Sequence, residues 1–594
     1  MVSNDGEDAA RENPNAETDT PTSDIRTVAV AVIVGLVLVA AGTSLAYWVT
    51  ISGGDISVED TTFETESGIE LVATVYEPSS ATIDEPAPAV VLIHGHGGER
   101  GTMSSFAQEF AERGYVAVSV DQPGHRDSEP PAYEDGWGGP AALEYTRSLE
   151  TTDADSVSMV GHSMGGFASL AAAKEHPDGY ESVVLVGSTW GVSGAPAANT
   201  TFPRNMAVVF SPYDEYAPVM FGESVPGKVA ESEKLTSAFG TNESVRPDEV
   251  YGNIEEGTGR RYTAPRTVHT GMHRSTATVA DTVEWVTLAT EGEESDEEAQ
   301  SWYWATFGHV IAFVGAFVVA VGVAGITWRR FGSLVDSATE ENNDDGNDGW
   351  AYRWVLLGIT ALPALVLYPL YALGTVSVPV TRITHQELTH GYVLWALGSV
   401  AVGASVASWR YGWRETLSLT ERTSVLRALL AAIAGFAAVY LVVLIAGTVP
   451  GSGFRAWMVG LAPLPGFRWF SVAVYVVPLT LGTIALSVAV DHALPDRHGV
   501  LRHVGLALVL SCGGLVASLA VQYVPLFLGF GLPVPILGAL GITGIWATFL
   551  LGCAAVLAAA TTRLTDEALV GGILAGLVVT WMIAGTGPMT VAPF

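Results

Sequence analysis

A serine in a glycine-rich turn is the residue of this 594-residue sequence best placed to do chemistry. It is Ser163, within the run GHSMGG at residues 161–166. The stretch before it, 156–160, is apolar and β-branched enough for a buried strand, and residues 167–174 are rich in helix formers. A strand, a sharp turn and a helix would lift the Ser163 hydroxyl clear of a sheet, with a helix N-terminus behind it that favours negative charge. This context predicts a nucleophilic serine.

A serine hydroxyl needs a base to take its proton, and that base needs an acid to fix its tautomer. In a sheet of this kind the acid follows the serine in the chain, just after a later strand. Asp214 comes directly after the apolar stretch 206–210 and is therefore the predicted acid. Its neighbour Glu215 is the close alternative.

The base should come later still, before the last helix. Residues 275–289 have apolar positions at helical spacing, and two histidines precede them. His269 directly follows 265–268, which we predict to be the last strand, so His269 is the predicted base. His273 lies nearer the helix and remains the alternative base.

The negative charge that develops on a carbonyl oxygen during attack needs two backbone N–H donors. One should be the amide of Met164, the residue after the nucleophile. The other should come from the loop after the apolar strand 88–93, where His96 or Gly97 is placed for it. Three other histidines near these loops are predicted to be structural: His94, His125 and His162.

Strands and helices alternate between residues 54 and 292 and predict an α/β domain with a mostly parallel sheet. Apolar and polar residues alternate along 61–78 on both sides of a Ser-Gly turn, which predicts a β-hairpin. The later predicted strands are 88–93, 115–120, 156–160, 182–187 and 206–210, and the predicted helices include 102–113, 139–149 and 275–289.

Four features stand in order in this domain, with strands between them: HGHGG at 94–98, DQPGHRDS at 121–128, GHSMGG at 161–166, and Asp214. Together they resemble the α/β-hydrolase fold, in particular its serine aminopeptidase/monoacylglycerol-lipase-like and dienelactone-hydrolase-like branches. The resemblance covers about residues 60–290. It implies an eight-stranded, mostly parallel sheet and a Ser163–His269–Asp214 triad.

Two features depart from that family pattern. Residues 125–128 read His-Arg-Asp-Ser, where relatives often read His-Gly-x-Ser. The connection between strands 182–187 and 206–210 is short, where many members insert a large lid. The second departure argues against a deep pocket closed by a lid of the domain's own.

The rest of the chain predicts an all-α polytopic membrane domain. Residues 27–48 carry no charge and are long enough to span a bilayer as an uncleaved anchor, with a cleaved signal peptide as the alternative. The polar, acidic residues 1–24 predict a disordered tail. Within 302–590 we predict eight further spans, about nine in all: 304–328, 354–376, 390–409, 426–447, 468–489, 502–524, 538–561 and 568–588.

The arginines predict which side of the membrane the α/β domain occupies. With the N-terminus inside, the inside segments and their edges carry 12 arginines and the short outside loops carry 3. Arginine in short loops resists translocation, whereas long domains cross regardless of charge. The predicted location is therefore a multi-pass protein of the cell membrane with residues 54–292 on the extracytoplasmic face.

The charge and the cysteine content of the chain limit which partners and cofactors are expected. The net charge of −34, with only three lysines, predicts a surface suited to high salt and argues against a nucleic-acid partner. Cys512 and Cys553 both lie in apolar runs, so we expect no disulfide framework, metal site or cofactor. A metal site is conceivable at 381–390, which holds two histidines and a glutamate, but a polar loop is the preferred interpretation.

Two hypotheses for function follow from these features. The first is a membrane-anchored serine hydrolase that cleaves carboxylic ester or amide bonds through an acyl-enzyme intermediate, acting on a small-molecule or lipid ester. The alternative is a membrane transport or scaffold protein with a hydrolase-like binding domain, or a serine peptidase. The presence of Ser163, Asp214 and His269 together favours the first. The oligomeric state is left open.

Overall fold

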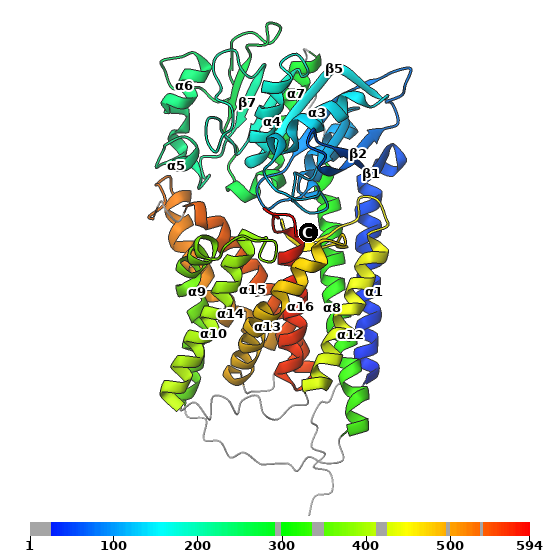
Figure 1. Cartoon of the computed structure of the whole chain (residues 1–594), viewed down its shortest axis with the longest axis vertical. Coiled ribbons are helices and arrows are strands. Elements are labelled where there is room, and N and C mark those ends of the chain that lie inside the picture. The colour runs from blue at the N-terminus through cyan, green and yellow to red at the C-terminus, as the bar shows by residue number, and fades with distance from the viewer. Residues whose placement is uncertain are drawn as a thin grey trace, which may run out of the picture.

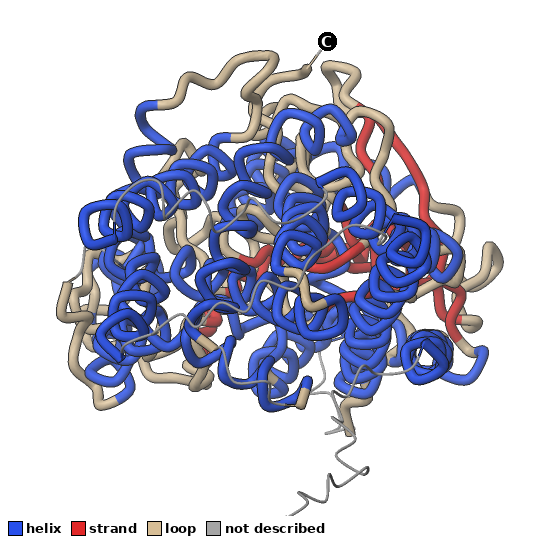
Figure 2. Tube along the Cα trace, turned by 90° about the horizontal axis from the view of Figure 1, so that it is seen from below, coloured by secondary structure: helices blue, strands red, loops and turns tan. Residues whose placement is uncertain are grey.

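The computed structural model describes residues 25–291, 299–335, 350–411, 425–494, 499–534 and 538–593. A sheet domain (residues 52–291) sits on one end of a bundle of long helices, which we call the helical domain (Figure 1). Seen from below, these helices lie side by side beneath the strands (Figure 2). The predicted tail at 1–24 lies outside the described residues.

The sheet domain is built on a nine-stranded sheet with strand order β1-β2-β4-β3-β5-β6-β7-β9-β8. Neighbours from β4 to β9 pair in parallel, whereas β1, β2 and β8 join antiparallel at the two edges. The strands are β1 (Ile56–Glu64), β2 (Glu70–Pro78), β3 (Ala87–Ile93), β4 (Val116–Val120), β5 (Thr152–His162), β6 (Ser182–Val186), β7 (Met206–Val209), β8 (Val250–Tyr251) and β9 (Arg260–Thr263).

Helices cover both faces of this sheet, which is why its inner strands β3, β4, β6 and β7 are almost wholly buried and mostly apolar. Side chains alternate between the faces: Val91 of β3 packs in the core under α3 (Gly139–Ser148) and α4 (Met164–Glu175). Its neighbour Leu92 packs in the opposite core, under α2 (Ser104–Glu112) and α7 (Thr276–Glu291).

Two expectations about the sheet need correction. The predicted last strand at 265–268 is wrong: β9 is Arg260–Thr263, which pairs with β7. Pro265 has no N–H to donate to a ladder, and the chain leaves the sheet there. The short edge strand β8 raises the count to nine from the eight expected.

The helical domain contains nine long helices at the positions of the predicted spans. They are α1 (Ile25–Thr50), α8 (Trp302–Val335), α9 (Trp350–Ser377), α10 (Glu387–Tyr411), α12 (Val425–Ala446), α13 (Arg468–Ala493), α14 (Val500–Phe527), α15 (Gly538–Thr565) and α16 (Ala568–Thr586). Seven of the described helices, all except α9 and α10, are long and apolar enough to cross a membrane. The described residues thus support about seven of the nine expected spans, and Leu365–Ser377 of α9 forms a shorter apolar helix.

Helices α1 and α8, which precede and follow the sheet domain in the chain, pack side by side through glycines. A Cβ on Gly42 would lie 2.5 Å from the carbonyl oxygen of Gly308, and one on Gly35 would lie 2.9 Å from that of Gly315. Small residues at such positions let two helix backbones approach closely, as in membrane helix pairs. The two ends of the sheet domain are therefore anchored next to each other.

Polar contacts fasten the sheet domain to the helical domain. Glu99 forms ion pairs with Arg126 (3.2 Å) and with Arg455 (3.0 Å), which lies between α12 and α13. Burial favours the neutral acid, but the arginines outweigh burial and lower the pKa of Glu99. Near the C-terminus, Met589 donates its backbone N–H to the carbonyl oxygen of Gly124 at 2.8 Å. The C-terminal end thus lies between the two domains (Figure 1).

Candidate active site

Ser163 stands at the turn between β5 and α4, in the backbone conformation that the sequence context predicts. Its φ is +53°, a left-handed value that is strained for a side chain larger than glycine. The two flanking glycines are required by close approach: a Cβ on Gly161 would collide with the backbone of Gly165, and one on Gly165 would collide with that of Ile93. The strain therefore holds the Ser163 hydroxyl out of the sheet.

His269 joins Ser163 to Asp214. Its Nε2 lies 3.0 Å from the Ser163 Oγ, and its Nδ1 lies 2.8 Å from an Asp214 carboxylate oxygen. His269 and Asp214 are both buried, and the ring of Tyr216 lies 4.6 Å from the imidazole. The structure thus brings together three predicted site residues, from the loops after β5, β7 and β9, in a continuous hydrogen-bonded chain.

The surroundings of His269 favour its protonated form. Burial alone would lower the pKa of His269, but the charge and hydrogen bond of Asp214, together with the charge of Glu215, outweigh burial and raise it. A histidine in this environment accepts a proton from a hydroxyl more readily than a free imidazole does.

Glu215, the alternative acid, contacts the backbone of His269 and not its ring. One of its carboxylate oxygens accepts the His269 N–H at 3.1 Å, and the other accepts the hydroxyl of Tyr523, from α14, at 2.8 Å. Burial and the nearby Asp214 charge raise the pKa of Glu215. Asp214 is therefore the residue placed to orient the imidazole, and Glu215 supports the loop that carries it.

His273, the alternative base, lies in the same short helical turn as His269 but away from the serine. Its ring nitrogens are buried and have no hydrogen-bond partner among the described residues. Burial lowers the pKa of His273 well below its ordinary value, and its ring lies 5.5 Å from that of His162. His162 in turn contacts the carbonyl oxygen of His269 through Nε2 at 3.2 Å. His162 and His273 therefore pack against each other beside the turn that carries His269.

Both predicted oxyanion donors lie beside Ser163. Met164 is the first residue of α4, so no carbonyl within that helix accepts its N–H. The loop carrying His96 lies against the serine, because a Cβ on Gly95 would come within 3.0 Å of the Ser163 Cβ. Gly97, the alternative donor to His96, follows in a left-handed conformation.

His94 and His125 hold the loops around this site. The Nε2 of His94 accepts the backbone N–H of Gln122 at 3.1 Å, and its Nδ1 contacts the carbonyl oxygen of Gly95 at 2.7 Å. His125 contacts the carbonyl oxygen of Pro123 through Nδ1 at 3.0 Å. Burial lowers the pKa of His94 to about 4 and that of His125 well below its ordinary value, so both stay neutral.

The sequence analysis missed two residues of this site. Tyr216 packs on the His269 ring, and its position two residues after Asp214 was the available signal. Tyr523, which bonds Glu215 from α14, lies in an apolar run and carried no signal at all. It becomes visible only when the two domains are placed together.

The conceivable metal site at 381–390 is instead a hydrogen-bonded loop. His385 lies 2.6 Å from the hydroxyl of Ser471, and His390 lies 3.1 Å from that of Tyr475. Across the described residues, no group of three or more His, Cys, Asp or Glu side chains is arranged to hold a metal ion.

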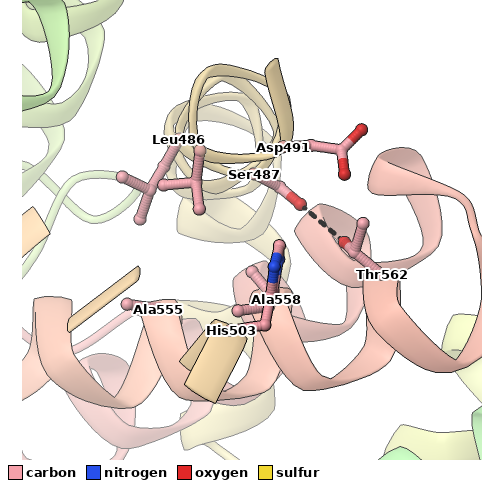
Figure 3. Close-up of a pocket in the computed structure, with 9 residues that line it drawn as sticks. Leu486, Ser487, Asp491, His503, Ala555, Ala558 and Thr562 are labelled. Atoms are coloured by element: carbon pink, nitrogen blue, oxygen red, sulfur yellow. Dashed lines mark hydrogen bonds between the residues drawn. The ribbon is translucent and has the colours of Figure 1, made fainter. Parts of the chain in front are cut away.

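A small pocket with polar side chains lies within the helical domain, among α13, α14 and α15 (Figure 3). Asp491, Ser487, His503 and Thr562 line it, and the hydroxyls of Ser487 and Thr562 are 3.2 Å apart. The pocket has a volume of about 10 Å³, which is room for about one water molecule. It is therefore too small to hold a transported solute in this conformation.

Residues 88–219, from β3 to just after Asp214, match the family model described as "alpha/beta hydrolase fold". The sheet domain is an α/β-hydrolase domain. The match leaves the helical domain outside it and supports a hydrolase.

Relatives of known name align only with parts of this hydrolase domain. A 1-acylglycerol-3-phosphate O-acyltransferase of Arabidopsis thaliana is 30% identical over 120 residues, which cover 18% of this chain and 26% of the relative. A 2-hydroxy-6-oxo-6-phenylhexa-2,4-dienoate hydrolase of Burkholderia cepacia is 28% identical over 130 residues, which cover 21% of this chain and 45% of the relative. The chain thus spans less than half the length of either relative.

Solved structures align over similar lengths. An α/β-hydrolase from Penicillium is 18% identical with a TM-score of 0.20, covering 24% of this chain and 48% of that one. An epoxide hydrolase from Vigna radiata is 19% identical with a TM-score of 0.18, covering 22% and 38%.

Proposed function

We propose that this protein is a membrane-bound serine hydrolase that cleaves carboxylic ester or amide bonds. The observation that carries the proposal is the chain of hydrogen bonds from Asp214 through His269 to Ser163, at 2.8 and 3.0 Å. Distances of this size are within the reach that proton transfer to and from a hydroxyl requires.

In the proposed mechanism, His269 takes the proton of the Ser163 hydroxyl as its Oγ attacks the substrate carbonyl carbon. The carbonyl electrons move onto oxygen, and the N–H groups of Met164 and His96 stabilise that oxyanion. The leaving alcohol or amine then departs with the proton from His269, which leaves an acyl-serine. A water molecule, deprotonated by His269, attacks the acyl-serine and releases the acid and free Ser163.

Asp214 supports this cycle by holding the tautomer of His269 that presents an unprotonated Nε2 to the serine. It also stabilises the imidazolium that forms during attack. The raised pKa of His269 agrees with this role, since the Asp214 charge is among its causes.

The long apolar helices support a place in a bilayer, and we propose that the hydrolase domain faces outward. Arginines on the opposite end of the bundle support this sidedness. Arg427 donates to the carbonyl oxygen of Trp328 at 2.8 Å, and Arg329 donates to that of Leu564 at 2.9 Å, both far from the hydrolase domain. Clustered arginine at this end is the pattern expected of a cytoplasmic side.

A transport or scaffold role, the alternative from sequence, has less support. The helical domain's polar pocket around Asp491 holds about one water, whereas the hydrolase domain keeps a complete set of catalytic side chains. A serine peptidase would use the same chemistry as a serine esterase. A panel of ester and amide substrates therefore decides between an esterase and a peptidase.

The experiment compares the purified full chain with Ser163→Ala on p-nitrophenyl esters and aminoacyl p-nitroanilides. Loss of the nucleophile should reduce turnover on the order of 10⁶-fold. Ser237→Ala, at an exposed serine in α6 (Glu233–Phe239), serves as the matched control and should retain activity. Near-normal turnover by Ser163→Ala would contradict the proposal.

A further inference from the structure

The loop predicted to supply an oxyanion donor rests directly on the helical domain. A Cβ placed on Gly97 would lie 2.7 Å from the Cη2 of Trp546, on α15, and 3.6 Å from a Cδ of Leu388, on α10. Gly97 follows His96 and is itself the alternative donor. Trp546 and Leu388 of the helical domain therefore contact the loop that is predicted to hold the substrate carbonyl oxygen.

His96 precedes Gly97 and lies beside this contact. Burial lowers the pKa of its imidazole to about 4. Tyr133 stacks on it at 5.8 Å between ring centres, with its hydroxyl 3.3 Å from the His96 Nδ1.

The segment after α16 reaches the loop that carries Tyr133, because Ala132 donates its backbone N–H to the carbonyl oxygen of Met589 at 2.8 Å. The pKa of Tyr133 is raised by burial and then by the charges of Glu387 and Tyr371. Tyr371 also acts on Tyr216, which packs on the catalytic imidazole. The helical domain and the segment after it therefore contact the hydrolase domain both beside Tyr133 and at Glu215, the neighbour of Tyr216.

The hydrolase domain contributes no cover of its own at the place where many relatives carry a lid. Residues 187–205, between β6 and β7, are all described and contain no helix. The helical domain lies directly below the hydrolase domain in Figure 1, and its contacts with Gly97 and Glu215 place it against the loops around Ser163, where such a lid would lie.

We propose that the helical domain forms one wall of the substrate site, with Trp546 and Leu388 receiving the acyl chain of a long-chain carboxylic ester from the adjoining membrane leaflet. This inference rests on the proposed function. The wall is aromatic and aliphatic, which suits a hydrocarbon chain. Trp546 sits on α15, one of the helices long and apolar enough to cross a membrane, so an acyl chain that leaves Ser163 along this helix would pass from enzyme to bilayer without crossing water.

Trp546 carries a further indication of a ligand. Its side chain is 8% exposed, and its indole Nε1 has no hydrogen-bond partner among the described residues. A buried donor left without an acceptor is costly, and an ester oxygen of a bound substrate is a chemically suitable acceptor.

A separate contact links the helical domain to the chemistry itself, and from it we infer that Tyr523 is a positioning residue. Tyr523 is buried and bonds one carboxylate oxygen of Glu215 at 2.8 Å, while the other carboxylate oxygen holds the backbone N–H of His269 at 3.1 Å. Tyr213, next to Asp214, packs against Phe527 on the same helix at 5.4 Å. The catalytic loops are therefore braced by α14.

The wall is tested by chain-length preference in proteoliposomes of the full chain. The substrates are p-nitrophenyl butyrate, which stays in water, and p-nitrophenyl palmitate, which partitions into the bilayer. We expect the wild type to prefer palmitate, and Trp546→Ala or Leu388→Ala to lower the palmitate-to-butyrate ratio of kcat/KM at least tenfold. Trp48→Ala, at a tryptophan 62% exposed near the end of α1, should leave the ratio unchanged.

The proposed wall would be contradicted if the wild type preferred butyrate. It would also be contradicted if the palmitate-to-butyrate ratio of kcat/KM were unchanged in both Trp546→Ala and Leu388→Ala. Reaction of Ser163 with a fluorophosphonate probe separates this failure from failure of the proposed function: a chain that labels but shows no chain-length effect is a serine hydrolase without this wall. If Trp546→Ala does not fold, Leu388→Ala alone decides the matter.

Tyr523→Phe gives a different signature. Removing only the hydroxyl should lower kcat several-fold for both esters and leave KM and the palmitate-to-butyrate ratio unchanged. The reason is that Tyr523 acts through Glu215 on the position of His269 and does not contact the acyl chain of the substrate. An unchanged kcat, or a loss confined to KM, would overturn the positioning role.

Discussion

Arg468, at the start of α13, donates a hydrogen bond of 2.9 Å to the backbone carbonyl oxygen of Gly124 in the hydrolase domain. The same guanidinium donates to the carbonyl oxygens of Arg126 and of Gly587, the latter at 2.7 Å. The Arg468 side chain is fully buried. One residue therefore joins a helix of the bundle, the segment after α16 and the loop after β4.

Arg468→Ala should destabilise the protein strongly. The change leaves several buried carbonyl oxygens without donors, at a cost of about 1–3 kcal/mol each. Thermal unfolding in detergent measures the effect, and Arg382→Ala, at an exposed arginine in the loop before α10, is the control that should change little. Equal melting temperatures for the two variants would show that Arg468 does not hold the domains together.

His269→Ala should lose activity on the order of 10⁴-fold or more, whereas His273→Ala should keep most of it. The reason is position: the His269 Nε2 lies 3.0 Å from the Ser163 hydroxyl, whereas the His273 ring packs near His162. Measured kcat/KM values on one ester compare the two variants directly. A reversed order of losses would make His273 the base.

Glu215→Gln should move the acid limb of the pH profile of kcat/KM to lower pH. The charge of Glu215 helps to raise the pKa of His269, and glutamine removes the charge while keeping an oxygen for the His269 N–H. With a lower pKa, His269 stays neutral, and able to act as base, down to a lower pH. Glu231→Gln, at an exposed position, should leave the limb in place. A shift to higher pH in Glu215→Gln would contradict this electrostatic account.

Local patterns were enough to predict most of the hydrolase domain. The strand, turn and helix around Ser163 follow from apolar β-branched residues, close-packed glycines and helix formers, all read within about twenty residues. The last strand was misplaced because β9 (Arg260–Thr263) begins with two arginines, whereas the residues after Pro265 look more strand-like. In the structure, Arg260 is buried, and its guanidinium donates to the carbonyl oxygen of Asn199 at 2.8 Å.

The contribution of the helical domain to the site had no such local signal. Tyr523 and Glu215 stand 308 residues apart in the chain, and Trp546 meets Gly97 over a still longer separation. In the sequence, Tyr523 and Trp546 looked like ordinary residues of membrane helices. Only the docking of one domain on the other, through Glu99, Arg455 and Arg468, brings them to the catalytic loops.

The hydrolase domain should be reachable from outside intact cells. Both native cysteines are buried, so single cysteines can be introduced with little background. Asn242→Cys, at an exposed position of the hydrolase domain, should react with an impermeant maleimide in intact cells. Asn343→Cys, in the acidic segment after α8, should react only after permeabilisation. The opposite pattern would place the hydrolase domain in the cytoplasm.

The most direct measurement for the central claim is covalent labelling of the full chain by a fluorophosphonate, with the modified residue located by mass spectrometry. An activated serine attacks the phosphorus and retains the phosphonyl group, so the account predicts a single adduct on Ser163. It also predicts that His269→Ala strongly slows labelling, because the hydroxyl then has no base. No adduct on Ser163 in folded wild-type protein, or an adduct that forms equally fast in His269→Ala, would contradict a serine hydrolase mechanism.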